Sequence, residues 1–310
     1  LVGSEMCIRD RTATDPAGNT STASILALTV DTTAPAAPTA SVAAASDTGA
    51  SQTDQITADT TPTLTGTGTS GDTITVTLPT GEVLTTVVAA NGTWSVTPTQ
   101  ALANGTQNVS VTATDPAGNT SAPSLLSLTV DTQAPAAPSA TLAASSDSGV
   151  KNDGVTNDST PTISGTGANP GDTITLYAPN GTTVLGTAVV AANGSWAITP
   201  TTPLIDGLQA LSVAATDPAG NQSAATAVPV TIDTTAPAAP LADVSAASDT
   251  GVSQTDHITA DNTPTIVGTG TAGDTITVTM PTGEVLTAVV AANGSWSVTP
   301  LQAMSEGSQS

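Results

Sequence analysis

The chain has 310 residues and a formal net charge of −22, with three Lys and Arg residues against 25 Asp and Glu residues. Nucleic acid is excluded as a partner, because phosphate binding needs many Lys and Arg side chains. No apolar run is long enough to cross a membrane, and no basic amphipathic stretch could insert into one. A single cysteine, Cys7, excludes a fold held by disulfides.

Residues 1–11, "LVGSEMCIRDR", match no other part of the chain, and they hold Cys7 and two of the three basic residues, Arg9 and Arg11. The string resembles translated sequencing-adapter sequence, so we interpret it as a non-native segment and leave it out of the fold prediction. The alternative is a native N-terminus with a redox-active thiol, for which the sequence offers no partner cysteine.

The rest of the chain is a tandem repeat. "DPAGN" begins at Asp15, Asp115 and Asp217, so the intervals are 100 and 102 residues, and "DTTAPAAP" and "VVAANG(T/S)W" return with the same period. The period predicts the end of one repeat at 12–32, repeat 1 at 33–132, repeat 2 at 133–234, and repeat 3 at 235–310, truncated before its last strands. We expect the sequence to be an internal fragment of a longer array.

Within each repeat, short runs alternate between apolar and hydroxyl residues. "DTITVTL" places Ile74, Val76 and Leu78 on one face and threonines on the other, as a half-buried strand does. "TPTLTG", "EVLTTVV", "TWSVTP", "NVSVTA" and "LSLTV" supply further strands, separated by Gly, Pro and Asn. Several short strands in about 100 residues predict an all-β fold, with one β-sandwich per repeat.

A hairpin and a tryptophan follow one another in every repeat. The phrase "AANG" contains Asn-Gly, a strong hairpin signal, and Trp94, Trp196 and Trp296 come directly after it. One tryptophan per unit, in a chain with a single Tyr and no Phe, is expected in the core. The alternative is a surface platform on which a sugar could stack.

Two turn phrases connect the strands and the repeats. "DTTAPAAP" carries two prolines three residues apart, which favours an extended, semi-rigid connection between sandwiches. "DPAGN" has the residues of a type I turn that closes a hairpin, with the glycine free to take the left-handed conformation.

The combination "TPTLTGTG…GDTITVTL…ANGTWSVTP…VSVTATDPAGNTS…LTVDTTAP" resembles the bacterial Ig-like repeats of giant surface adhesins and biofilm-associated proteins, over roughly residues 12 to 310. The resemblance implies about seven strands per sandwich, an extended rod, type I secretion and an extracellular, cell-surface location. It also implies calcium at the joints between repeats, which in several such adhesins stiffens the rod.

Acidic residues gather in the phrases around each joint. If the Ig-like topology holds, we expect Asp31, the group 47/54/59, Asp115 and Asn119 to meet at one joint, and Asp131, the group 147/153/158, Asp217 and Asn221 at the next. The full set of candidate Ca²⁺ ligands is Asp31, Asp47, Asp54, Asp59, Asp115, Asn119, Asp131, Asp147, Asp153, Asp158, Asp217, Asn221, Asp233, Asp249, Asp256 and Asp261.

Two carboxylates about 5 Å apart repel by roughly 3 kcal/mol at an effective dielectric constant near 20, so such a cluster favours a cation or wide spacing. Ca²⁺ takes six to eight oxygen ligands. Zinc and copper favour Cys and His side chains, of which this chain has only His257 and, in the segment interpreted as non-native, Cys7. The alternative is that these residues are solvated turn residues that keep the protein soluble. We expect the aspartates of "GDTIT" (Asp72, Asp172 and Asp274) at the opposite pole, in a turn.

No catalytic constellation is present, because His257 is alone and the serines have no basic partner. We therefore predict no enzyme activity, and a stalk that projects a distal adhesive region. Its expected partners are neighbouring repeats and, through regions outside this sequence, a host or abiotic surface or a matrix component. The alternatives are repeats that themselves bind carbohydrate or another surface ligand, and ice or mineral binding by threonine-rich faces such as "TITVT".

Overall fold

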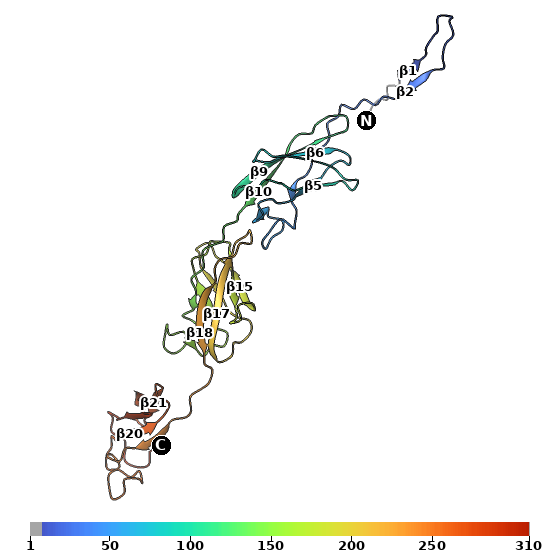
Figure 1. Ribbon diagram of the computed structural model, residues 1–310. Coiled ribbons are helices and arrows are strands. Elements are labelled where there is room, and N and C mark those ends of the chain that lie inside the picture. The colour runs from blue at the N-terminus through green and yellow to red at the C-terminus, as the bar shows by residue number, and fades with distance from the viewer. Residues whose placement is uncertain (1–7, 310) are drawn as a thin grey trace. The chain divides into compact units, whose positions relative to one another are not determined.

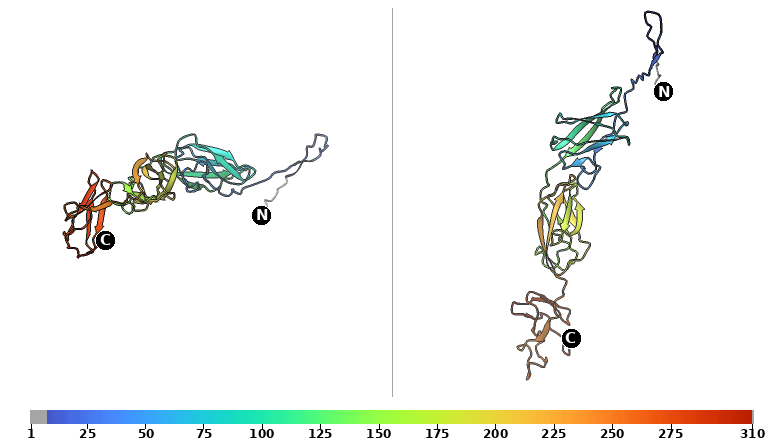
Figure 2. Two further views of the ribbon diagram at one scale, coloured as in Figure 1. Left: turned by 90° about the horizontal axis from the view of Figure 1, so that it is seen from below. Right: turned by 45° about the vertical axis from the view of Figure 1, so that its right-hand side comes forward.

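A computed structural model describes residues 8–309 of the chain, and all the elements in this range are β-strands. The chain divides into two compact units between Asp233 and Thr234. The first unit contains repeats 1 and 2 and the second contains repeat 3 (Figure 1). Two further views show the strands and loops of each unit from other sides (Figure 2).

Repeat 1 is a sandwich of a three-stranded and a five-stranded sheet, in the orders β3-β5-β8 and β4-β10-β9-β6-β7. The strands are β3 (Ser41–Val42), β4 (Ile56–Thr57), β5 (Leu64–Thr67), β6 (Thr73–Thr77), β7 (Val83–Val87), β8 (Thr93–Val96), β9 (Gly105–Thr114) and β10 (Ser124–Val130). The predicted β-sandwich is confirmed, and the repeat has eight strands because β3 and β4 add two-residue pairings at the sheet edges.

Repeat 2 has the same order, β11-β13-β16 and β12-β18-β17-β14-β15. Its strands are β11 (Thr141–Leu142), β12 (Val155–Thr156), β13 (Ile163–Gly165), β14 (Thr173–Tyr177), β15 (Val184–Val189), β16 (Trp196–Ile198), β17 (Gly207–Thr216) and β18 (Thr226–Ile232). In Figure 1 the long strands β17 and β18 run side by side, as their antiparallel register from Gly207↔Ile232 to Val213↔Thr226 requires.

Repeat 3 has a three-stranded sheet, β19-β20-β23, and a pair, β21-β22. The strands are β19 (Leu241–Val244), β20 (Ile266–Thr269), β21 (Thr275–Thr279), β22 (Val285–Val289) and β23 (Ser295–Val298). At the N-terminal end of the described range, β1 (Ile8–Arg11) pairs with β2 (Ser24–Leu26). Cys7 lies outside the described residues.

One strand in each complete repeat runs parallel to its neighbour. β4 pairs in parallel with the end of β10, with Thr129 opposite Ile56, and β12 does the same with β18. A parallel neighbour ends at the same pole of the sandwich as its partner. The loop around β4 therefore lies at the pole where the chain leaves repeat 1, and this decides which acidic residues can meet.

The core follows the period-two pattern. In repeat 1, Leu64 and Trp94 from the small sheet and Ile74, Val111 and Leu128 from the large sheet belong to one buried cluster. The exposed fractions of Trp94, Trp196 and Trp296 are 3%, 4% and 5%, so the prediction that the tryptophans lie in the core is confirmed.

Each tryptophan faces a glycine on the neighbouring strand. Gly165 is opposite Trp196, and a Cβ there would be 1.8 Å from the Ser139 carbonyl oxygen and 2.7 Å from the indole. The equivalent glycines of repeats 1 and 3, Gly66 and Gly268, have the same surroundings. The glycine of this strand is therefore required by the space that the ring and the neighbouring backbone occupy.

Candidate functional site at the repeat joint

The DPAGN turn is the first component of the joint. In repeat 2 the Gly220 N–H donates to the Asp217 carbonyl at 3.0 Å, and Gly220 has a φ of 93°. The turn joins the long strands β17 and β18, so the predicted hairpin turn is confirmed. The Asp217 carboxylate accepts the Asn221 N–H and the Asn221 Nδ2 amide, both at 2.9 Å.

The asparagine of the turn also binds the incoming chain. Asn221 Nδ2 donates to the Asp131 carbonyl at 2.8 Å, and Asn119 Nδ2 donates in the same way to the Asp31 carbonyl at 3.1 Å. The carboxylates of Asp31 and Asp131 accept the backbone N–H two residues on, from Thr33 and Gln133. The linkers that begin at Asp31 and Asp131 are therefore attached to the DPAGN turn of the repeat that follows each of them.

Two aspartates of the "GDTIT" phrase lie at the same pole of the sandwich as the DPAGN turn, whereas the sequence predicted them at the opposite pole. Asp72 and Asp172 directly precede β6 and β14, and Thr173 pairs with Thr216, the residue before the DPAGN turn of repeat 2. The expectation that "GDTIT" lies at the opposite pole is therefore wrong, because β14 runs antiparallel to β17 and starts where β17 ends. Burial raises the pKa of the Asp172 carboxyl, and the N–H that Asn169 donates lowers it in part. The nearby negative charges of Asp217 and Asp131 raise the pKa further.

The predicted grouping of the loops is also wrong by one joint. The Asp131 N–H donates to the Thr57 carbonyl at 2.8 Å, so the loop with Asp47, Asp54 and Asp59 lies beside Asp131 and not beside Asp31. In the same way the Asp233 N–H donates to the Thr156 carbonyl, which places the 147/153/158 loop beside Asp233. The cause is the parallel pairing of β4 and β12, which no turn signal in the sequence indicates.

The loop of repeat 1 contacts the turn of repeat 2 directly. Thr48 Oγ1 donates to the Ala219 carbonyl, and a Cβ on Gly49 would be 2.0 Å from the Pro218 carbonyl oxygen. Ala219 is 1% exposed and Asp217 is 8% exposed, whereas Ala117 and Ala17, the equivalents of Ala219 in the other two DPAGN turns, are exposed. The joint between repeats 1 and 2 is therefore a packed contact between two turns, and Thr48 and Gly49 were missed because neither residue type signals a contact by itself.

The remaining predicted ligands are engaged in their own loops. Asp59, Asp158 and Asp261 each accept the N–H of the threonine two residues on, at 2.9 Å. Asp54, Asp153 and Asp256 accept an N–H two residues on in the same way. The Asp115 carboxylate accepts two hydrogen bonds from Asn119, one from its backbone N–H and one from its side-chain amide. The bond from the side-chain amide is the main cause that lowers the pKa of the Asp115 carboxyl.

Buried carboxylate oxygens test whether a cation fits. Within residues 8–309 no group of three or more His, Cys, Asp and Glu side chains is close enough to share a metal ion. Four buried carboxylate oxygens nevertheless have no hydrogen-bond partner: Asp47 Oδ1, Asp72 Oδ2, Asp147 Oδ1 and Asp249 Oδ1. A buried charged oxygen without a partner is costly, and hard oxygen donors are the ligands that Ca²⁺ prefers. The donor chemistry therefore fits Ca²⁺.

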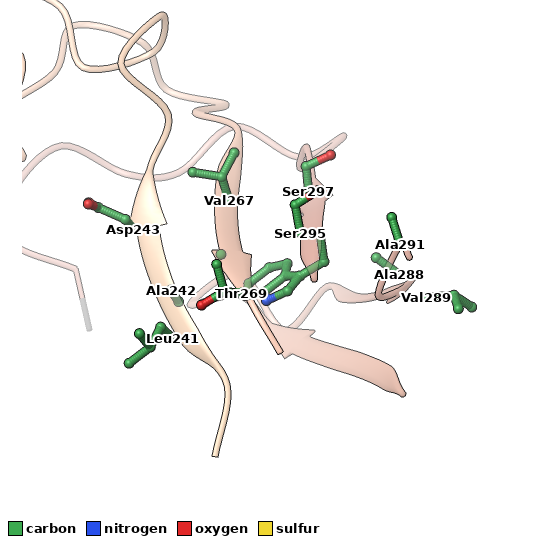
Figure 3. A pocket seen from close by; sticks show the side chains of 12 residues that line it. Leu241, Ala242, Asp243, Val267, Thr269, Ala288, Val289, Ala291, Ser295 and Ser297 are labelled. Carbon is green, nitrogen blue, oxygen red and sulfur yellow. The ribbon is translucent and has the colours of Figure 1, made fainter. Parts of the chain in front are cut away.

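The surface of repeat 3 bears on the carbohydrate alternative. A cavity of about 800 Å³ in repeat 3 is lined by β19, β20, β23 and the end of β22 (Figure 3). Its labelled side chains are mostly small or aliphatic, with Asp243 at one side. The indole of Trp296 also lines the cavity but is almost fully buried, so this surface offers no exposed ring for a sugar.

Comparisons with known proteins place the chain in a family. No curated protein matches it. Among solved structures it is similar to a Ca²⁺-stabilised adhesin with which an Antarctic bacterium reaches out and binds ice (31% identity, 93% of this chain and 71% of that chain, TM-score 0.34). It is also similar to a tetra-tandem repeat from the extending region of a large adhesion protein (24%, 93% and 71%, 0.28) and to a 1.5-MDa bacterial ice-binding adhesin (27%, 86% and 88%, 0.32).

The model of the bacterial Ig-like domain matches residues 33–132, 134–234 and 235–310. These three matches cover most of the chain and follow one another without long gaps. The chain belongs to the bacterial Ig-like domain family.

Proposed function

We propose that this chain is a stretch of the stalk of a bacterial cell-surface adhesin, outside the cell, whose repeats hold a distal binding region away from the surface and support adhesion and biofilm formation. The observation that carries the proposal is the packed joint, in which Thr48 and Gly49 of repeat 1 contact the DPAGN turn of repeat 2. A stalk needs neighbouring domains that keep a fixed orientation, and a turn-to-turn contact supplies this where a flexible linker would not.

The role is structural and not enzymatic. The acidic residues lie on turns that recur with the repeat, and the acidic turns Asp115–Asn119 and Asp217–Asn221 use their carboxylates to hold the turn itself. Within the described residues no helix is long and apolar enough to cross a membrane. The family match and the similarity to repeats of large adhesins agree with a stalk.

Calcium at the joints is the second part of the proposal. Ca²⁺ would draw together Asp131, Asp172 and Asp217 at the joint before repeat 2, and Asp31, Asp72 and Asp115 at the joint before repeat 1, since without the ion these side chains are not close enough to share it. The buried Asp72 Oδ2 without a partner, and the influence of Asp217 and Asp131 on the pKa of Asp172, support this assignment. When bound, Ca²⁺ would supply positive charge that offsets the repulsion among these carboxylates.

Small-angle scattering of the full chain with calcium and with excess chelator tests the stalk. We expect one fixed shape whose dimensions loosen on chelation, together with no binding on a glycan array and no cell adhesion by the isolated chain. Saturable binding of one class of glycan would support the carbohydrate alternative and overturn the stalk. A scattering profile that chelator leaves unchanged would overturn calcium at the joints and leave the packed joint to be tested separately.

A further inference from the structure

The Asn-Gly hairpin before each tryptophan carries a second motif. A hydroxyl residue stands two places after its asparagine in every repeat, in the pairs Asn91 with Thr93, Asn193 with Ser195, and Asn293 with Ser295. The pattern N-x-(S/T) is the acceptor motif for N-linked saccharides on the surface of secreted proteins. Such a motif also arises by chance in a chain with many threonines and serines, so its geometry decides whether it can be used.

The motif is kept at this hairpin and lost at the other Asn-Gly turns. The turn 104–106 of repeat 1 reads N-G-T, but Asp206 and Glu306 stand in place of its asparagine in repeats 2 and 3. The turn 180–182 of repeat 2 also reads N-G-T, and Thr80 and Thr282 stand in place of its asparagine in repeats 1 and 3. The hairpin before the tryptophan keeps both the asparagine and the hydroxyl in all three repeats.

The hydroxyl residue bonds the asparagine side chain in the same way in each hairpin. Asn91 Oδ1 accepts the Thr93 N–H at 3.1 Å and the Thr93 hydroxyl at 2.8 Å. The corresponding distances are 3.1 and 2.7 Å for Ser195, and 3.1 and 2.8 Å for Ser295. All three asparagines are exposed, and no group among residues 8–309 accepts a hydrogen bond from their Nδ2 atoms. The amide oxygen is therefore held, and the amide nitrogen faces solvent.

This arrangement favours reaction at Nδ2. An amide nitrogen is a weak nucleophile until it loses a proton, and the negative charge that then develops lies mainly on Oδ1. Two donors aimed at Oδ1 stabilise that charge. In the transfer, the bond between C1 of a nucleotide-activated hexose and its phosphate breaks, and the nucleoside diphosphate leaves with the electron pair. Nδ2 forms the new bond to C1 while its proton passes to a base of the transferase.

The DPAGN turn carries the same motif with its amide engaged. Asn119 begins N-T-S and Asn221 begins N-Q-S. Their Nδ2 atoms donate to the carboxylate of the turn and to the carbonyl of the linker, in the sets Asn119 with Asp115 and Asp31, and Asn221 with Asp217 and Asp131. A saccharide on these nitrogens would break bonds of the joint. The chain therefore offers asparagines that match in motif and differ in the freedom of the amide.

We propose that Asn91, Asn193 and Asn293 are acceptor sites for an N-linked saccharide, one on the hairpin of each repeat, whereas Asn119 and Asn221 are not. A neutral hexose would leave the formal net charge of −22 unchanged and add hydrated bulk to the exposed hairpins between β7 and β8, β15 and β16, and β22 and β23. The proposal goes beyond the stalk role and does not depend on calcium.

Peptide mass spectrometry of the full chain, after incubation with UDP-glucose and a soluble N-glycosyltransferase that reads N-x-(S/T), compares both classes of asparagine in one sample. We expect peptides with Asn91, Asn193 and Asn293 to gain one hexose each, and peptides with Asn119 and Asn221 to be occupied several-fold less. Synthetic peptides of both sequences should react alike, which controls for the preference of the enzyme. Thr93→Ala should remove the hexose from Asn91 alone, and Thr93→Ser, the residue type of repeats 2 and 3, should keep it.

A hexose gain concentrated on the hairpins would support the proposal. Equal occupancy of the hairpin and DPAGN asparagines in the folded chain would overturn it, because the freedom of the amide would then not matter. Unmodified hairpins in a folded chain, under conditions in which the synthetic peptides react, would overturn it as well. Conversion of the hairpin asparagines to aspartate in place of hexose transfer would also contradict it, since it would show spontaneous deamidation of Asn-Gly instead.

Discussion

Replacing Gly49 by alanine tests the joint, and the chain contains a matched control. Gly49 and Gly149 occupy the same place in the phrases "SDTG" and "SDSG", and both have positive φ, 95° and 60°. A Cβ on Gly49 would be 2.0 Å from the Pro218 carbonyl oxygen, whereas a Cβ on Gly149 would meet no atom within 4 Å. Both substitutions therefore place a side chain at positive φ, and they differ in the contact with the next repeat.

The magnitude follows from the contacts. A side chain in the left-handed region costs roughly 1–2 kcal/mol, which both variants bear. Gly49→Ala must also separate the two turns, which breaks the Thr48–Ala219 hydrogen bond, a loss of about 0.5–1.5 kcal/mol. Exposing the Ala219 methyl group adds about 0.8 kcal/mol. We expect Gly49→Ala to destabilise unit 1 by about 1–2 kcal/mol more than Gly149→Ala does.

Calorimetry of the full chain and of both variants measures the difference. A change of 1 kcal/mol shifts the Tm of a unit as large as Leu1–Asp233 by roughly 2–4 °C, so the two variants should be clearly separated. Equal shifts for Gly49→Ala and Gly149→Ala would refute the reasoning, because they would mean that the contact with Pro218 and Ala219 contributes nothing.

Four further predictions concern the turn, the core, pH and calcium. Asn221→Ala removes the amide that bonds both Asp217 and the Asp131 carbonyl, and should destabilise repeat 2 by about 1–3 kcal/mol in chemical denaturation. This loss should exceed that of Asn19→Ala, since the Asn19 amide bonds Asp15 within its own turn. Gly165→Ala should lower the free energy of unfolding by about 1–3 kcal/mol and change the Trp196 fluorescence, because the new methyl group overlaps the Ser139 carbonyl and the indole. Gly68→Ala, whose Cβ would meet Val88 at 3.1 Å, should lower it less. Without calcium, the pKa values of Asp172 and Asp47 in the folded state are raised above 3.8, so the folded chain binds more protons than the unfolded chain between pH 3.8 and the raised values. The free energy of unfolding should therefore increase as pH falls through this window. A urea midpoint that decreases over this window, and that Asp172→Asn leaves unchanged, would contradict this. Ca²⁺ at 10 mM should stabilise the chain by about 1.4 kcal/mol for each site with a Kd near 1 mM, and an unchanged melting curve after chelation would contradict binding.

The strands and turns could be predicted because each depends on local sequence. The alternation in "DTITVTL", the Asn-Gly hairpin before each tryptophan and the turn chemistry of DPAGN all specify structure over fewer than ten residues, and the structure confirms them. The burial of Trp94 could also be predicted, since one large ring per small domain has few other places to pack.

The joint could be predicted only in part, because its members come together through long-range pairing. The attachment of Asn119 to Asp31 was foreseen, but the loop with Asp47 was assigned to the wrong joint, since a two-residue parallel pairing leaves no periodic signal. The place of Asp172 depends on the antiparallel register of β14 with β17, and the contact of Gly49 depends on a neighbouring repeat. Neither can be derived from the spacing of acidic residues.

The central claim is that repeats 1 and 2 are held in one fixed orientation by the turn-to-turn joint. The most direct measurement is the distance distribution between spin labels at the exposed positions Val87 and Val189, which are 60% and 66% exposed, in a full chain with Cys7→Ser so that only the two introduced cysteines react. We predict one narrow distance distribution for this chain and a broader one when Gly49→Ala is added. A distribution that is already broad without Gly49→Ala, as a flexible linker would give, would contradict the account.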